Sequence, residues 1–146
     1  MVLPEFNENG DLPQGIYCAT IKEIVDRFGH FPSGRKALAI RLKRIYKIAA
    51  ETDHLLRFII FGSFVTSKMY PNDIDVFLLM DDEFAYSKVT EEEKLLFDHN
   101  LAQSHFGCSV FWIRKCAAFE GVEKTIGYWQ IKRDGDFRGI IEVTGE

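Results

Sequence analysis

Two aspartates, Asp73 and Asp75, stand at the start of an apolar run that continues to Met80. Side chains two residues apart in a strand point to the same face, so the carboxylates should lie together while Ile74 and Val76 enter the core. Like charges at a partly buried strand end repel, so one is hard to ionise unless a cation lies between them. Mg²⁺ fits, because it takes one or two carboxylates and completes its shell with water and phosphate oxygens. The pair therefore predicts a magnesium site.

A glycine and a serine, Gly62 and Ser63, end the preceding apolar run, and nine residues separate Ser63 from Asp73. Glycine lets the backbone come close to a ligand. Ser63 offers a hydroxyl and a backbone N–H at the predicted start of a short helical segment, where phosphate is favoured. Neighbouring metal and phosphate sites are what phosphoryl or nucleotidyl transfer requires, because the cation neutralises the phosphate under attack while the loop holds the rest of the triphosphate.

These residues resemble the signature of the nucleotidyltransferase superfamily, which includes DNA polymerase β and the minimal nucleotidyltransferases of prokaryotes. The signature is Gly-Ser, a short spacer and Asp-x-Asp between apolar strands, and Gly62-Ser63 with Asp73-Ile74-Asp75 matches it over roughly residues 35–115. Leu12–Ile16 and the end of the chain are similar to an uncharacterised bacterial branch of that superfamily. As a pattern, Gly-Ser with Asp-x-Asp in an apolar frame is more specific than Asp-x-Asp alone.

The resemblance implies roles for four residues: Asp73 and Asp75 would be catalytic and bind the metal, and Gly62 and Ser63 would bind the nucleotide. It implies Mg²⁺ as the cofactor and a nucleoside triphosphate as substrate. The expected reaction transfers a nucleoside monophosphate to an acceptor hydroxyl, which a protein, an RNA or a small molecule would carry.

A third carboxylate, usual in that superfamily on the neighbouring strand, is missing. Ser109 occupies its expected place within the apolar stretch 107–112, and Asp98 and Glu120 would need a change in geometry to replace it. A serine is neither a charged ligand nor a useful base at neutral pH. Two hypotheses therefore stay open. The chain is an active nucleotidyltransferase, or it is a degenerate binding or regulatory module with a protein partner, as in toxin–antitoxin or defence pairs.

Ordinary structural roles are the alternatives for several residues. Asp73 would cap the turn after Pro71-Asn72, and Asp75 would pair with a lysine or arginine. Arg35 and Lys36 either approach the triphosphate or belong to a solvated basic face. The aromatic residues that could stack on a base more often fill a core: Phe111, Trp112, Tyr128 and Trp129.

The elements that must position these residues follow from periodicity and end signals. Ile16 to Phe28 has helical spacing, and a second helix should follow Ser33, whose hydroxyl can cap it. A capping box at Thr90 predicts a helix to about His105. Strands are expected at 57–61, 74–80 and 110–113, and a C-terminal hairpin at 128–132 and 137–143 around Asp134-Gly135. The predicted fold class is α/β (α+β), a mixed sheet flanked by helices and similar to the nucleotidyltransferase fold.

Composition sets the remaining limits. The chain has 146 residues, of which 47% are hydrophobic, and we expect a single domain, 1–146, with an irregular N-terminal arm, 1–15. A net charge of −4 argues against general electrostatic binding to nucleic acid. The three cysteines form no CxxC pair, no signal peptide is evident, and no apolar run approaches the roughly 20 residues of a membrane span. A cytoplasmic protein with no membrane partner is predicted.

Overall fold

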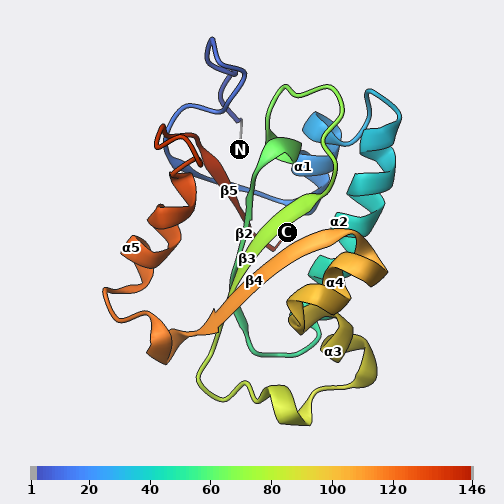
Figure 1. Ribbon diagram of the computed structural model, residues 1–146, viewed down its shortest axis with the longest axis vertical. Helices are drawn as coiled ribbons and strands as arrows, with labels where there is room; N and C mark the ends of the chain where they lie inside the picture. Colours follow the sequence, from blue (N-terminus) through green and yellow to red (C-terminus); the bar gives the residue numbers. More distant parts are fainter. Residues whose placement is uncertain (1–2, 146) are drawn as a thin grey trace.

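Five strands form one mixed sheet in residues 3–145, the part of the chain that the computed structural model describes. They are β1 (Ile16–Ala19), β2 (Leu55–Phe61), β3 (Ile74–Met80), β4 (Cys108–Arg114) and β5 (Ile140–Val143). Their order is β1-β5-β2-β3-β4 (Figure 1). β2 runs antiparallel to β5 and β3, whereas β1 pairs with β5, and β3 with β4, in parallel.

Helices flank both faces of the sheet, unequally. They are α1 (Ile21–Phe28), α2 (Gly34–Ala50), α3 (Glu91–Phe97), α4 (His99–Phe106) and α5 (Val122–Gly127). Figure 1 shows α1 to α4 on one side of the sheet and α5 on the other. No helix within residues 3–145 has the length and apolar character to cross a membrane. The predicted fold class, a mixed sheet flanked by helices, is confirmed.

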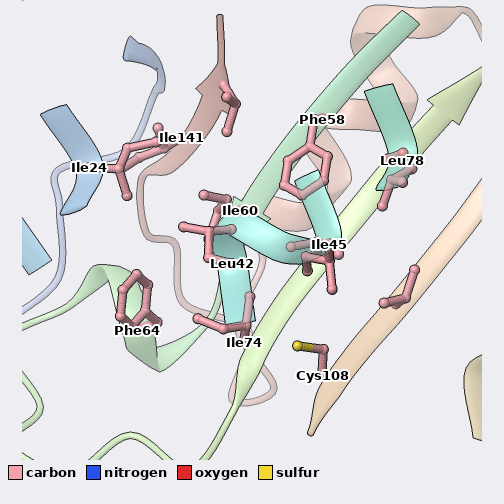
Figure 2. Packing of buried hydrophobic residues seen from close by; sticks show 14 of the residues in the cluster. Ile24, Leu42, Ile45, Phe58, Ile60, Phe64, Ile74, Leu78, Cys108 and Ile141 are labelled. Atoms are coloured by element: carbon pink, nitrogen blue, oxygen red, sulfur yellow. The ribbon is translucent and has the colours of Figure 1, made fainter. Parts of the chain in front are cut away.

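The larger core lies between the sheet and helices α1 to α4. Alternate residues of β3, Ile74, Val76 and Leu78, are fully buried in it, as the period of two predicts. Figure 2 shows Leu42 and Ile45 of α2 in the same cluster. Four residues form the apolar stripe of α2 and are buried: Leu38, Leu42, Ile45 and Ala49.

A smaller core covers the opposite face of the sheet. Ile59 of β2 with Phe77 and Leu79 of β3 is buried there against Ile126 of α5, and Trp129 packs on the cluster. Several aromatic side chains at its margin stay open to solvent, and Phe119 is 92% exposed. Packing on this face is therefore less complete than under the four helices.

The first predicted helix is wrong over its first four residues. Ile16–Ala19 is β1, and the helix begins only at Ile21, where Thr20 and Glu23 form a capping box. The reason is long-range pairing, because Ile16 lies opposite Ile140 of β5 in a parallel ladder. A four-residue strand followed at once by a helix carries too few residues for its period to stand out.

The predicted C-terminal hairpin is present only next to its turn. Gly135 has the expected positive φ, +87°, and one antiparallel bridge, Ile131 to Phe137, joins the two sides with a backbone hydrogen bond on either side of it. The first side contains a 3₁₀ turn at Tyr128–Gln130, and the second becomes β5, whose partners are β1 and β2. The apolar residues of 128–132 and of 137–143 pack against different parts of the chain, and the local sequence pattern does not indicate which parts these are.

Two helix predictions hold at their starts and need corrections elsewhere. Thr90 forms the predicted capping box, but the helix breaks at Asp98 before the predicted end at about His105. The Asp98 side chain accepts from the N–H of Leu101 and so starts α4. The helix after Ser33 starts as predicted, yet the Ser33 hydroxyl makes no capping hydrogen bond because its backbone is already helical.

The N-terminal arm contains no helix or strand from residue 3 to 15, and it packs closely on the domain. Residues 1, 2 and 146 of the predicted domain lie outside the described chain. Leu12 is fully buried and Asp11 is 5% exposed. Ser67 donates its N–H to the carbonyl of Gly10, and Gly139 donates to that of Leu12. The arm thereby joins the loop after β2 to the segment that enters β5.

Candidate functional site

The two aspartates lie at the start of β3, on the face opposite the four helices. Asp75 is the second residue of β3, and Asp73 precedes the strand by one residue. Asp75 pairs in register with Phe61 at the end of β2 and with Ser109 in β4. Ile74, between the aspartates, is fully buried on the helix side. The structure thus brings both carboxylates to one end of the sheet, as the spacing predicts.

Gly62 brings the turn after β2 directly against Asp75. Its backbone has φ +84° and ψ −169°, a conformation that is essentially restricted to glycine. A Cβ atom at this position would collide with Oδ2 of Asp75. Ser63 then opens the predicted short helical segment, a 3₁₀ turn at Ser63–Val65. The four predicted site residues are therefore neighbours, and the glycine is required by the closeness of the carboxylate.

Hydrogen bonds tie Asp73 to the neighbouring strand and to α4. The Ser109 hydroxyl donates to Oδ2 of Asp73 over 3.2 Å. The Gln103 amide donates to the same oxygen over 3.3 Å and to the Ser109 hydroxyl over 2.5 Å. Sequence reasoning missed Gln103, which lies on a helix whose pattern gives no sign that this side chain faces the aspartates. Ser109 lies where the sequence placed it, beside the carboxylate pair.

Asp75 has a raised pKa and forms no ion pair in the described chain. Burial and, second, the negative charge of Asp73 together raise the pKa of Asp75 to about 6, although the Ser109 hydroxyl and the positive charges of Arg138 and Arg133 oppose this shift. In residues 3–145 neither carboxylate forms an ion pair with a lysine or arginine. The alternative in which Asp75 pairs with a basic residue is therefore wrong for the described chain. The hydrogen bonds of Asp73 go to side chains, so its predicted capping of the preceding turn is wrong as well.

Arg35 does not reach toward a triphosphate. Its side chain is 4% exposed, and its guanidinium donates hydrogen bonds to four backbone carbonyls. Those carbonyls belong to Phe28, Phe64, Thr66 and Lys68. Since the side chain is buried and four of its five N–H groups are used by these carbonyls, the predicted approach to phosphate is wrong for Arg35. It instead fixes the loop that follows Gly62 and Ser63.

Neither of the other acids takes the place of the missing carboxylate. Asp98 caps α4 through the N–H of Leu101, and Glu120 is paired with Lys124 over 3.8 Å. Within residues 3–145 no group of three or more His, Cys, Asp and Glu side chains is placed to hold a metal. Two carboxylates alone still suit Mg²⁺, which keeps several waters and takes further oxygens from substrate phosphates. Asp73 and Asp75 would hold such an ion.

Aromatic rings continue the same face of the sheet beyond Asp75. Trp129 lies with its ring centroid 4.6 Å from that of Phe61, 5.2 Å from that of Phe77 and 5.2 Å from that of Phe111. Phe111 is two residues beyond Ser109 in β4 and remains 39% exposed. These rings form the smaller core and extend toward solvent beside the carboxylates. Their planar faces suit stacking interactions.

Comparison with known proteins gives one match. No curated protein and no solved structure matches the chain. The model of a family of unknown function, DUF6932, matches residues 4–144, which include the carboxylates, the Gly62 turn, the arm and β5. The chain therefore belongs to the DUF6932 family.

Proposed function

We propose that this protein is a nucleotidyltransferase-like protein that binds Mg²⁺ and a nucleoside triphosphate and transfers a nucleoside monophosphate to an acceptor hydroxyl. One observation carries the proposal: Asp73 and Asp75 lie together at the start of β3, without an ion pair to a lysine or arginine in the described chain, against the Gly62 turn. Placing two carboxylates there without a partner costs stability, and a bound divalent cation would offset that cost.

The chemistry follows from these positions. Asp73 and Asp75 would hold Mg²⁺ through carboxylate oxygens, while Gly62 and Ser63 would lie along the triphosphate. The acceptor oxygen attacks the α-phosphorus, and the bond from that phosphorus to the β-bridging oxygen breaks, so pyrophosphate leaves. Bound Mg²⁺ would supply charge neutralisation on the phosphate under attack. The hydroxyl proton passes to solvent, because Ser109 is no base at neutral pH.

Ser109 favours a second candidate, a degenerate nucleotide-binding or regulatory module. Its hydroxyl and the Gln103 amide occupy Oδ2 of Asp73, where an active enzyme would need a freely coordinating carboxylate. Absence of a general base lowers a rate by about 10²- to 10⁴-fold while binding survives. In that case a protein partner would read the nucleotide-bound state, for example in a toxin–antitoxin or defence pair. For both candidates we propose a cytoplasmic location, because the cysteines are free thiols, as a reducing compartment requires.

Label transfer from an α-phosphate-labelled nucleoside triphosphate tests the enzyme directly. Wild type, Asp73→Asn/Asp75→Asn and Ser109→Asp are incubated with Mg²⁺ and with protein, RNA or small-molecule fractions as acceptors, and pyrophosphate release is followed. Asp26→Asn is the matched control, since Asp26 is an exposed aspartate of α1 paired with Lys22.

The outcomes separate the two candidates. Transfer by wild type and by the control, with loss in the double variant, supports the enzyme. Transfer only by Ser109→Asp supports the degenerate module. Equal transfer by wild type and the double variant would contradict any role of the carboxylates in catalysis.

A further inference from the structure

A cavity of about 270 Å³ lies beside Ser63, enclosed by the N-terminal arm, the loop after β2 and the segment that leads into β5. Three cationic side chains line it, Lys68, Lys132 and Arg138. Asp11 is the one acidic residue among its described lining residues. Three positive charges against one negative charge leave a surplus of two positive charges around the cavity. A cavity of this character favours an anion.

The surplus charge is not neutralised within residues 3–145. Lys132 donates to Oδ2 of the buried Asp11 over 2.8 Å, which accounts for the one carboxylate. Arg138 and Lys68 form no ion pair in this part of the chain, and the buried Nε of Arg138 has no hydrogen-bond partner. A buried donor without a partner is costly. Because Arg138 lines the cavity and has no ion pair in the described chain, its guanidinium charge is placed to meet an anion there.

The walls of the cavity are fixed by backbone contacts. Ser67 donates its N–H to the carbonyl of Gly10 over 2.9 Å, and Gly10 itself has a positive φ of +82°. A Cβ atom on Gly10 would collide with the Ser67 hydroxyl. Arg35 holds the other end of the loop through the carbonyls of Thr66 and Lys68. These contacts hold the N-terminal arm and the loop that carries Lys68 in place.

The Gly62–Ser63 turn links this cavity to the carboxylate pair. Arg138 lines the cavity together with Ser63. Ser63 lines the cavity, and the adjacent Gly62 contacts Asp75. A chain of phosphates that begins at the carboxylates would therefore extend past Ser63 into the cavity.

We propose that Lys68, Lys132 and Arg138 form an anion site for the terminal phosphates of the nucleoside triphosphate. The identity of this ligand rests on the proposed function, whereas the anion site itself requires no metal. Arg138 offers its planar fork to two phosphate oxygens, and the lysines add point charges. The segments that supply these residues, the loop after β2 and the entry to β5, differ from the N-terminal end of α2 that the sequence suggested.

Inorganic tripolyphosphate in EDTA is the probe, measured by calorimetric titration at a constant ionic strength of about 0.1 M, where the Debye length is about 10 Å. Wild type is compared with Arg138→Gln, Lys68→Gln and the control Lys47→Gln, which removes one positive charge from the exposed face of α2. We expect affinity to fall about tenfold or more in Arg138→Gln and several-fold in Lys68→Gln, because each loses a charge-assisted contact. Lys47→Gln should stay within about twofold, since a distant surface charge is screened.

The exposed Lys68 keeps the test valid if Arg138→Gln fails to fold. Equal binding by wild type, Arg138→Gln and Lys68→Gln, or equal weakening by Lys47→Gln, would overturn the anion site. Asp73→Asn/Asp75→Asn, measured in parallel, should retain tripolyphosphate binding. If the anion site behaves as expected while ATP binding shows no dependence on Mg²⁺, the anion site stands and the proposed function fails.

Discussion

The two faces of β3 differ in what covers them and in what they carry. Val76 and Leu78 point toward α1 to α4 and are fully buried, whereas Asp75 and Phe77 lie on the face that α5 and the following 3₁₀ turn cover (Figure 1). A strand covered on both faces is normally apolar throughout. Asp75 interrupts that pattern at the strand end where the thinner cover stops. The polar groups of the candidate site thus lie on the face of the sheet that buries fewer apolar side chains.

Buried charges on the two sides of the sheet differ in the same way. Arg35, on the helix side, donates hydrogen bonds to four backbone carbonyls of the protein. Asp75, on the other side, has another carboxylate as its neighbour and forms no ion pair in the described chain. The first arrangement stabilises a loop. The second costs stability unless a ligand is bound.

The largest expected effect tests the difference in packing. Leu78→Ala leaves a cavity in the larger core, and we expect it to lower the free energy of unfolding by about 3 to 5 kcal/mol. Phe119→Ala, at the open margin of the smaller core, should change it by less than about 0.5 kcal/mol. Urea unfolding followed by circular dichroism measures both. Similar losses for the two variants would show that the faces are packed equally well.

The second largest effect is expected at Arg35, the buried charge that donates to four carbonyls. Arg35→Met removes four hydrogen bonds and leaves buried carbonyls without donors, so we expect a loss of about 3 kcal/mol in the free energy of unfolding. Lys36→Met, at the neighbouring exposed position, should cost less than about 0.5 kcal/mol. Because Arg35 holds the loop after Ser63, its loss should also weaken nucleotide binding. An Arg35→Met protein as stable as wild type would remove the structural role assigned to this side chain.

The uncompensated charge should appear in the pH dependence of stability. A pKa of about 6 for Asp75, above its ordinary value of 3.8, means that the folded state binds the proton more tightly than the unfolded state. The Asp75 contribution to stability is therefore fully present below about pH 4, is lost as the pH rises through about 6, and amounts to about 2 to 3 kcal/mol. Asp75→Asn, which stays neutral, should lack this loss.

Urea unfolding in EDTA measures the difference between Asp75→Asn and wild type at several pH values. We expect the variant to be more stable by about 2 to 3 kcal/mol at about pH 7 and nearly equal at about pH 4. A stability difference between variant and wild type that stays constant across this pH range would mean that burial and Asp73 do not raise the pKa of Asp75. Saturating Mg²⁺ should reduce the advantage of the variant at neutral pH, because the ion stabilises only the charged pair.

Local patterns predicted much of the framework of the site. The bounds of β3 agree with the sequence because an unbroken apolar run between turn residues leaves little choice. The start of α2 after Ser33 and the capping box at Thr90 are equally local signals. Gly62 and Ser63 were placed correctly beside the aspartates because antiparallel pairing of β2 with β3 sets Phe61 opposite Asp75.

Contacts between distant parts of the chain account for the rest. The strand β1 is not evident from local spacing because its partner, β5, lies at the other end of the sequence. Since β5 pairs with β1, only the part of the predicted hairpin next to its turn forms. Gln103 reaches Asp73 from a helix whose own pattern gives no such sign. Arg35 was misassigned because a basic residue in a basic stretch reads as exposed, whereas the loop after β2 surrounds it with carbonyls.

Calorimetric titration with ATP and GTP, with Mg²⁺ and in EDTA, tests the central claim most directly. Wild type and the control Asp26→Asn should bind in the presence of Mg²⁺ and much more weakly in EDTA, and Asp73→Asn/Asp75→Asn should lose the Mg²⁺-dependent part. Binding by the double variant equal to that of wild type, or no Mg²⁺-dependent binding by wild type, would contradict the account.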